Sequence, residues 1–494
     1  MKIFTLGIDY RSSKLLLPAA NEEDFIKTLV NVNYFKSIIA FMGELIQQLI
    51  PLQRGGEEGK SVRAGWTYIF NPNDPCFKDD ILKRKLKKLG EIRGMEKGPI
   101  EFAGKPQNEW FNWFKDNIDS KPINYFMLVG GPKEIPYGLQ SLLSTQRCVG
   151  RIAFDNPEGY IKYIDKVIAL EDSKKYSVDR KVLLFATDHG SEDPTHYFQK
   201  SFVDPLSGYL KEKNLLNNND TLVGETATNN NFRSQNEKTP ALVFVVSHGV
   251  ADVEDEKSIS NGGIYCPLHC TDKVKPEDFF GGEDVVSGTP CFSGSVFFQL
   301  GCYGYGVPSR EETPPWISGT GQYHKKGFVS LLPRKLLAHE NGPIAYIGHV
   351  DAALLNGSVD RAPAIEHQVH KDYMAPFTQA IEKLIVNNSP VGVAIHALCN
   401  ISTIMSHLFM QNRNNFRNLG RAISIEMPST ADHKFREWVK WNNTRNFMLF
   451  GDPGARLVLG NPGGRYDDPA QKNWYSINPM SNFSNGNSQT DIPS

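Results

Sequence analysis

A histidine and a cysteine each follow an apolar run that is typical of a buried strand. Residues 241–246 (ALVFVV) lead into Ser247, His248 and Gly249, and residues 295–300 (SVFFQL) lead into Gly301 and Cys302. In an open α/β sheet, functional side chains gather where parallel strands end, and neighbouring strands lie only about 5 Å apart. We therefore expect the imidazole and the thiol to face each other at one edge of a sheet.

A thiol beside an imidazole makes a nucleophile with its own base. The thiolate is the attacking species, and the imidazole favours its formation and later protonates the leaving amine. Gly249 allows a backbone N–H to approach the reacting carbonyl, and with the N–H of Cys302 it is expected to form an oxyanion hole. The alternative to a catalytic role is that both residues only pack in the core, since a lone cysteine at a strand end usually packs as a small apolar side chain. The joint occurrence, with the histidine about 50 residues before the cysteine, favours the catalytic pair.

The elements that must position this pair follow an α/β rhythm, in which short apolar runs alternate with helical patterns. The spacing predicts strands over residues 3–8, 125–129, 182–186, 241–246, 295–300, 344–347 and 447–450. It predicts helices over residues 22–49, 158–170, 328–337, 373–386 and 391–410. The asparagine-rich residues 214–239 are predicted to be an exposed loop between two halves.

Length and composition bound the organisation and the class of protein. A chain of 494 residues is too long for a single core, so several subdomains are expected. A formal charge of -1 argues against a nucleic-acid or membrane-surface partner. Seven widely spread cysteines, no signal peptide and no run of about 20 apolar residues favour a cytoplasmic thiol protein.

At these residues the chain resembles the caspase-like (clan CD) cysteine peptidases, most closely the gingipain-like and CHAT families of bacteria. The resemblance covers roughly residues 120–460 and rests on the motifs SHG and GC and on four further segments. These are residues 125–136 (YFMLVGGPKEIP), 149–152 (VGRI), 342–348 (GPIAYIG) and 446–453 (NFMLFGDP). The context of Cys302, Gly-Cys-Tyr-Gly, departs from the caspase pattern, and the absence of a secretion signal puts an extracellular role in doubt.

The resemblance implies a caspase-like sheet of mostly parallel strands flanked by helices, with an N-terminal α/β subdomain. We expect residues 1–118 to have an unassigned role, 119–235 to form the gingipain-like subdomain, 236–460 the catalytic domain and 461–494 a loosely ordered tail. The implied activity is a cysteine endopeptidase acting on protein or peptide substrates, with a regulatory protein partner and a role in bacterial stress or antiphage defence as further possibilities. The alternative is a catalytically silent scaffold or sensor that binds a protein partner.

The segment after the strand that follows the cysteine builds part of the specificity pocket in related enzymes. It contains Asp351 here, whose carboxylate would select a basic residue, unless it only caps residues 352–354. Asp188 is a second candidate, for the pocket or for orienting His248. Cys266, His269, Cys270 and Cys291 have side chains of the kinds that bind zinc, and Asp252, Glu254, Asp255 and Glu256 have side chains of the kind that binds calcium. We expect neither a metal nor another cofactor.

Overall fold

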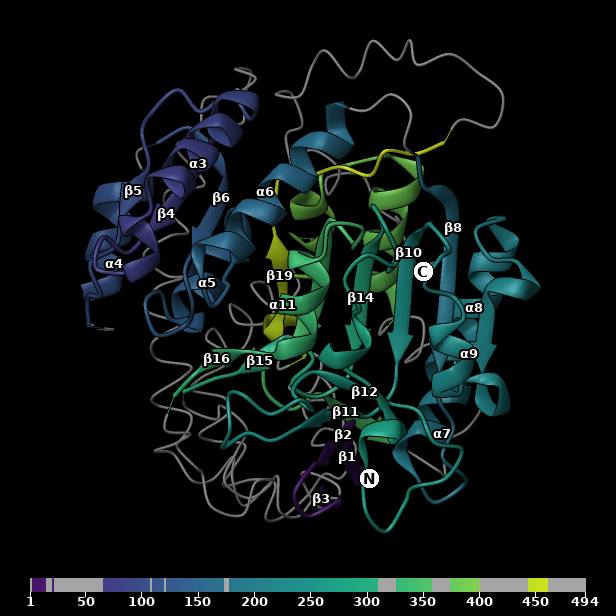
Figure 1. Ribbon diagram of the computed structural model, residues 1–494. Coiled ribbons are helices and arrows are strands. Elements are labelled where there is room, and N and C mark those ends of the chain that lie inside the picture. Colours follow the sequence, from purple (N-terminus) through teal and green to yellow (C-terminus); the bar gives the residue numbers. More distant parts are fainter. Residues whose placement is uncertain are drawn as a thin grey trace, which may run out of the picture.

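The computed structural model describes residues 2–14, 20–21, 65–106, 109–119, 121–172, 177–309, 326–357, 374–396, 398–399 and 443–460. Its main feature is a sheet of ten strands (Figure 1), built from β4 Gly65–Phe70, β5 Ile100–Glu101, β6 Ile123–Val129, β7 Cys148–Ile152, β8 Asp179–Ala186, β9 Thr221–Val223, β10 Pro240–Val246, β14 Val296–Leu300, β17 Ala345–His349 and β19 Phe447–Gly451. Their spatial order is β5-β4-β6-β7-β19-β17-β14-β10-β8-β9. Every neighbouring pair is parallel except β17 and β19. The predicted α/β class with a mostly parallel sheet is confirmed.

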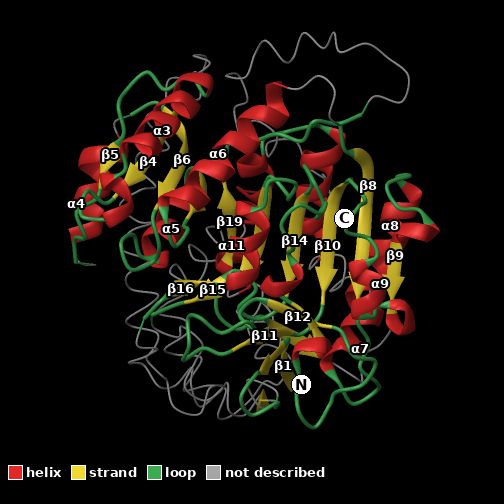
Figure 2. Ribbon diagram, in the orientation of Figure 1, coloured by secondary structure: helices red, strands yellow, loops and turns green. Residues whose placement is uncertain are grey.

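Helices cover both faces of the sheet because the strand side chains alternate between them. Phe126 and Leu128 of β6 belong to a buried cluster with α4 Trp110–Phe114 and α5 Tyr137–Ser144. Met127 and Val129 belong to the larger cluster, which includes apolar residues of α3 Asp80–Ile92 and α6 Pro157–Asp172. Figure 2 shows these helices packed along the strands. In the described part of the chain, further α-helices are α7 Pro194–Phe198, α8 Asp204–Glu212, α9 Asn229–Arg233 and α11 Leu331–Ala338, and residues 374–381 and 391–396 are also helical.

The described residues also form three smaller sheets. The strands β11 Gly249–Ala251, β12 Gly263–Tyr265 and β13 Phe279–Phe280 form a sheet with β2 Gly7–Asp9. The strands β1 Lys2–Thr5, β3 Ala20–Asn21 and β18 Leu354–Gly357 form another, and β15 Gly306–Val307 pairs with β16 Phe328–Val329. Figure 1 shows β1, β2, β11 and β12 gathered below the carboxyl end of β10. The chain therefore places its earliest described residues beside the His248 edge.

Three sequence predictions need correction. The strand predicted over residues 3–8 is broken at Leu6 into β1 and β2, neither of which joins the large sheet. The predicted loop over residues 214–239 contains α9 and the edge strand β9, because β9 finds a parallel partner in β8. The helix predicted from residue 328 begins at Leu331, since residues 328–329 form β16.

The region of unassigned role contributes β4 and β5 to the large sheet, where β4 pairs with β6. The domain boundaries themselves stay a prediction. The helix expected over residues 22–49, the end of the helix expected over 391–410 and the tail from residue 461 lie outside the described residues. None of the helices that the structure describes has the length and hydropathy of a bilayer-spanning segment.

Candidate active site

His248 and Cys302 occupy equivalent positions past two paired strands. Val246 of β10 pairs with Leu300 of β14 in parallel register, so each candidate lies two residues beyond that pair. The backbones of the following segments touch, since a Cβ on Gly249 would lie 1.9 Å from the carbonyl oxygen of Cys302 and 3.0 Å from its nitrogen. This contact admits only glycine at residue 249. Both candidate side chains are fully buried.

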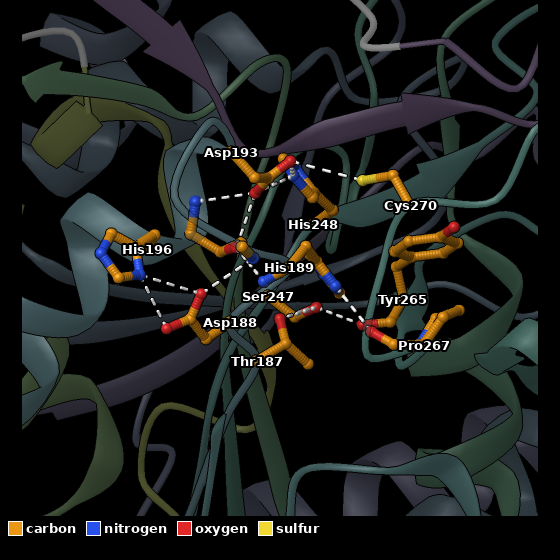
Figure 3. A network of polar contacts seen from close by, with 12 residues as sticks. Thr187, Asp188, His189, Asp193, His196, Ser247, His248, Tyr265, Pro267 and Cys270 are labelled. Carbon is orange, nitrogen blue, oxygen red and sulfur yellow. Dashed lines mark hydrogen bonds and ion pairs between the residues drawn. The ribbon is translucent and has the colours of Figure 1, made fainter. Parts of the chain in front are cut away.

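Asp193 holds the imidazole of His248, as Figure 3 shows. Nε2 of His248 lies 2.9 and 3.0 Å from the two carboxylate oxygens of Asp193. Because a carboxylate accepts, this contact assigns the ring proton to Nε2 and leaves Nδ1 as an acceptor. Nδ1 is buried and has no hydrogen-bond partner among the described residues. It is the ring nitrogen available for a thiol proton.

The carboxylate of Asp193 is fixed and remains ionised. Asp193 caps α7 by accepting from the N–H and the hydroxyl of Thr195, at 2.9 and 2.6 Å. Burial raises the pKa of Asp193, but the charge that His248 carries once it is protonated and the hydrogen bonds of His248 and Thr195 outweigh it and hold the pKa well below its usual range. A permanently charged carboxylate stabilises the imidazolium that forms when His248 takes up a proton.

A second histidine flanks the first. The ring of His189 lies parallel to that of His248, with centroids 5.4 Å apart and planes at 10°. Nδ1 of His189 lies 2.6 Å from the carbonyl of Pro267. Burial, followed by the charge that His248 carries once it is protonated, lowers the pKa of His189 to about 4, so the ring of His189 is neutral near pH 7. It forms an uncharged wall of the site.

The backbone N–H groups of Gly249 and Cys302 converge on one carbonyl oxygen. Both donate to the carbonyl of Leu6, at 3.0 Å from Gly249 and 2.7 Å from Cys302. Two donors aimed at one oxygen are the arrangement that stabilises a developing oxyanion. Here the oxygen belongs to the chain itself, at the residue where β1 and β2 separate.

The thiol of Cys302 lies between backbone groups of Ala353. Its sulfur accepts the N–H of Ala353 at 3.1 Å, and the thiol donates to the carbonyl of Ala353 at 3.6 Å. Burial raises the pKa of Cys302 above its usual range, whereas the N–H groups of Ala353 and Leu6 act in the opposite direction. In this arrangement the sulfur is protonated near pH 7.

Asp351 and Asp188 lie near the pair but have local partners. The carboxylate of Asp351 accepts the N–H of Ala352 at 2.7 Å, and the carbonyl of Asp351 accepts the N–H of Tyr303 at 2.9 Å. Both Asp351 and Tyr303 have positive φ, 73° and 53°, a backbone conformation that often marks functional sites. The carboxylate of Asp188 pairs with Nδ1 of His196 at 2.9 Å, so the contact to His248 belongs to Asp193 instead.

Cys270 adds a further thiol at the edge of the site. Cys270 is an exposed residue, but its sulfur lies 3.4 Å from Asp193, and desolvation of the thiol, followed by the charge of Asp193, raises its pKa to about 12. Among the described residues, one group of three His, Cys, Asp or Glu side chains has potential metal-ligand atoms that all lie within 4.8 Å of one another. It consists of Asp193, His248 and Cys270. Of the four residues weighed for zinc, only Cys270 belongs to it.

Sequence reasoning missed Asp193 and Leu6. The order Asp193-Pro194 does predict a helix N-terminus, because aspartate caps and proline fits the first turn. That signal gives the cap and not the contact to a histidine 55 residues later. Nothing in the sequence around Leu6 indicates that its carbonyl meets two N–H groups from distant segments.

The model of peptidase family C25 matches residues 104–458. The chain belongs to peptidase family C25. It is thus a gingipain-type, caspase-like (clan CD) cysteine peptidase, and the caspase-like fold predicted from the sequence is confirmed.

Solved structures give distant matches to this C25 chain. The Arg-specific cysteine proteinase gingipain R (RgpB) matches at 13% identity and a TM-score of 0.44, over 81% of this chain and 80% of that one. The complex of Porphyromonas gingivalis RgpB pro- and mature domains gives 12%, a TM-score of 0.45 and 80% of each chain. The Saccharomyces cerevisiae separase–securin complex gives 10% and a TM-score of 0.33, over 70% of this chain and 16% of that one. No curated protein matches the sequence.

Proposed function

We propose that this peptidase is an endopeptidase in which Cys302 is the nucleophile, His248 transfers the proton and Asp193 orients His248. The thiol of Cys302 gives its proton to Nδ1 of His248, and the thiolate attacks the carbonyl carbon of the substrate. As the carbonyl oxygen becomes negative, the N–H groups of Gly249 and Cys302 donate to it.

The second half of the cycle returns the proton. The tetrahedral intermediate collapses, the C–N bond breaks, and the amine leaves with the proton from Nδ1 of His248. Water, deprotonated by the same nitrogen, then hydrolyses the thioester and releases the new carboxyl end. Asp193 stays ionised throughout and keeps the ring in one tautomer.

One observation carries this proposal: two backbone donors converge on a single carbonyl oxygen directly beside the thiol. The donors lie 3.0 and 2.7 Å from that oxygen, and one of them is the N–H of Cys302 itself. A core cysteine needs no such convergence, because its backbone N–H could pair within the sheet. Nδ1 of His248, buried without a partner among the described residues, supports the same assignment.

Intact-mass detection of a peptide chloromethyl ketone adduct tests the nucleophile. We expect a single adduct on the wild type that is lost in Cys302→Ala and retained in the control Cys291→Ala. Hydrolysis of a casein substrate should follow the same pattern. Equal labelling with and without Cys302 would contradict the proposal and favour the silent scaffold.

A preference for a basic residue before the scissile bond stays a prediction. It rests on the buried carboxylate of Asp351, which lies close enough to raise the pKa of Cys302. One oxygen of this carboxylate accepts the N–H of Ala352, which supports the capping role that we weighed against the pocket role. Peptide reporters that differ only in the residue before the scissile bond separate the two roles.

The biological setting also stays a prediction: a cytoplasmic, regulated peptidase of bacterial stress or antiphage defence, with a regulatory protein partner. Capture of partners by Cys302→Ala, in cells with and without phage challenge, tests it. A partner set that is the same in both conditions would count against the defence role.

A further inference from the structure

Residues 2–9 run through the site that the proposed function assigns to a substrate. β1 pairs antiparallel with β18, and β2 pairs parallel with β11, the strand that directly follows His248. Leu6 lies between these two pairings. Extended peptides commonly bind proteins by adding a strand to a free sheet edge, with backbone hydrogen bonds supplying the affinity.

Leu6 makes the backbone contacts that a residue before a scissile bond needs. Its carbonyl accepts the two N–H groups of Gly249 and Cys302, and its own N–H donates to the carbonyl of Ala353 at 3.1 Å. Its N–H also lies near enough to the sulfur of Cys302 to influence the pKa of the thiol. The carbonyl of Leu6 is thus held by the proposed oxyanion donors, beside the proposed nucleophile.

The side chain of Leu6 shows what this position accepts. It is fully buried and belongs to the large hydrophobic core, together with Ala352, Ala353 and Leu354. A charged side chain in the same place would lose its hydration, whereas an apolar one gains from burial. The carboxylate of Asp351 accepts the N–H of Ala352, so it caps the backbone of the residues that pack beside Leu6.

Further contacts hold the segment where it leaves the site. The N–H of Tyr10 donates to the carbonyl of Ala251 at 3.0 Å, and the guanidinium of Arg11 pairs with Asp252 at 2.6 Å. Together with β1 and β2 they anchor Leu6 on both sides. Cys302 and His248 are consequently closed off, each with 0% of its surface exposed.

From these contacts we infer that residues 2–9 occupy the substrate cleft in the manner of a substrate, with Leu6 in the place of the residue before the scissile bond. The inference rests on the proposed function and adds two properties to it. The cleft is closed until this segment leaves, and it takes an extended peptide with an apolar residue before the bond to be cut, in place of the basic residue that the carboxylate of Asp351 alone would favour.

The first test measures how fast iodoacetamide alkylates Cys302, followed by peptide mass spectrometry. Leu6→Glu should accelerate alkylation roughly tenfold or more, because a buried carboxylate without a partner is expelled from an apolar site. Leu6→Met keeps an apolar side chain and should stay close to the wild type. Lys14→Glu introduces the same charge on an exposed residue just after the anchored segment and should also leave the rate unchanged.

The outcomes separate this inference from the proposed function. If Cys302 is alkylated at the same rate in the wild type and in folded Leu6→Glu, residues 2–9 do not close the cleft. The inference then fails, while the proposed function stands. If chloromethyl ketone reporters never label Cys302 in the folded Leu6→Glu chain but do label other thiols, the proposed function fails. Circular dichroism and thermal unfolding establish that the variant is folded.

The second test varies the substrate and needs only the wild-type protein, so it does not depend on a substitution. Reporters with the sequence Ile-Phe-Thr-X, where X is Leu, Arg or Asp, reproduce residues 3–6 and vary the last one. We expect the Leu reporter to be cut roughly tenfold faster or more, since an apolar pocket rejects a charged side chain. Preference for Arg or Asp would overturn the inference and leave the peptidase assignment intact.

Discussion

At the scale of single residues, the contact between Asp193 and His248 determines what the imidazole can do. A carboxylate accepts the proton on Nε2 and leaves Nδ1 free to take one from a thiol. The capping hydrogen bonds from Thr195 hold this carboxylate in place. The helix end and the proposed proton transfer therefore depend on the same side chain.

Asp193→Asn should lower kcat/KM by about 10²- to 10⁴-fold, with the protein still folded. The amide of asparagine can donate to Nε2, which places the ring proton on Nδ1, where it cannot receive the thiol proton. Asp220→Asn is the matched control, because Asp220 pairs with Lys238 away from the site. Steady-state hydrolysis of the Leu reporter, measured across pH, gives kcat/KM for Asp193→Asn and for Asp220→Asn. Loss of less than about threefold in Asp193→Asn would remove Asp193 from the mechanism.

The same carboxylate makes stability depend on pH. Because the pKa of Asp193 is lower in the folded protein than in the unfolded chain, its charge stabilises the fold above the unfolded value of about 4. This stabilisation is lost as the pH falls from the pKa of Asp193 in the unfolded chain through its lower pKa in the folded protein. We expect the unfolding free energy of the wild type to fall relative to that of Asp193→Asn below about pH 4. Urea unfolding from pH 7 down to pH 3 measures the difference, and a constant difference would refute the argument.

Cys302, His248 and Gly249 could be selected from the sequence because each signal is local. Both chemical side chains follow an apolar strand and stand beside glycine. Asp193 could not be selected, since its contact joins two segments that meet only in the folded chain.

At the scale of elements, the two halves of the large sheet meet where β7 lies beside β19. The register of this junction consists of one pair, Phe450 with Arg151. Gly150 makes the approach possible, because a Cβ there would lie 2.2 Å from the carbonyl oxygen of Gly451. The guanidinium of Arg151, fully buried, donates to the carbonyls of Gly130 and Ile135 and to the side chain of Gln140.

Gly150→Ala should destabilise the fold by about 1–3 kcal/mol or more, because backbone and not a flexible side chain opposes the added methyl. Gly208→Ala is the control: this glycine lies in α8 and a Cβ there would meet nothing within 4 Å. Alanine in a helix should raise stability by about 0.5–1 kcal/mol. Chemical denaturation distinguishes the two, and equal effects would contradict the close contact.

The strands of the large sheet were predictable where they were apolar runs. The strand predicted over residues 241–246 is β10 Pro240–Val246, and the strand predicted over residues 447–450 is β19 Phe447–Gly451. Sheet order was not predictable, because β19 comes last in the described chain yet lies between β7 and β17. The break at Leu6 was also missed, since a short apolar run does not reveal that two different sheets share it.

At the scale of the whole molecule, a buried charge cluster ties together segments from across the chain. Arg93, after α3, pairs with Glu171 of α6 and with Asp452 after β19, and Asp452 also accepts the indole N–H of Trp66 in β4. The side chain of Asp452 has 0% exposure. These contacts fasten β4, α3 and α6 to the segment that follows β19.

Arg93→Met should lower the unfolding free energy by about 3–5 kcal/mol, because it leaves the carboxylate of Asp452 buried without its cation. Lys83→Met removes a lysine of an exposed ion pair in α3 and should change the unfolding free energy by less than about 0.5 kcal/mol. Thermal and urea unfolding of both variants measure the contrast. A small loss in Arg93→Met would mean that the cluster does not join the two halves.

The strand break at Leu6 has a kinetic consequence. A segment attached to the same chain faces the cleft at an effective concentration of roughly millimolar, whatever the concentration of protein. Dilution cannot release it, and a free peptide of micromolar intrinsic affinity must outcompete this tethered rival. Turnover would then be governed by how often the tether detaches, so a ligand that captures residues 2–9 elsewhere would act as an activator without touching the cysteine.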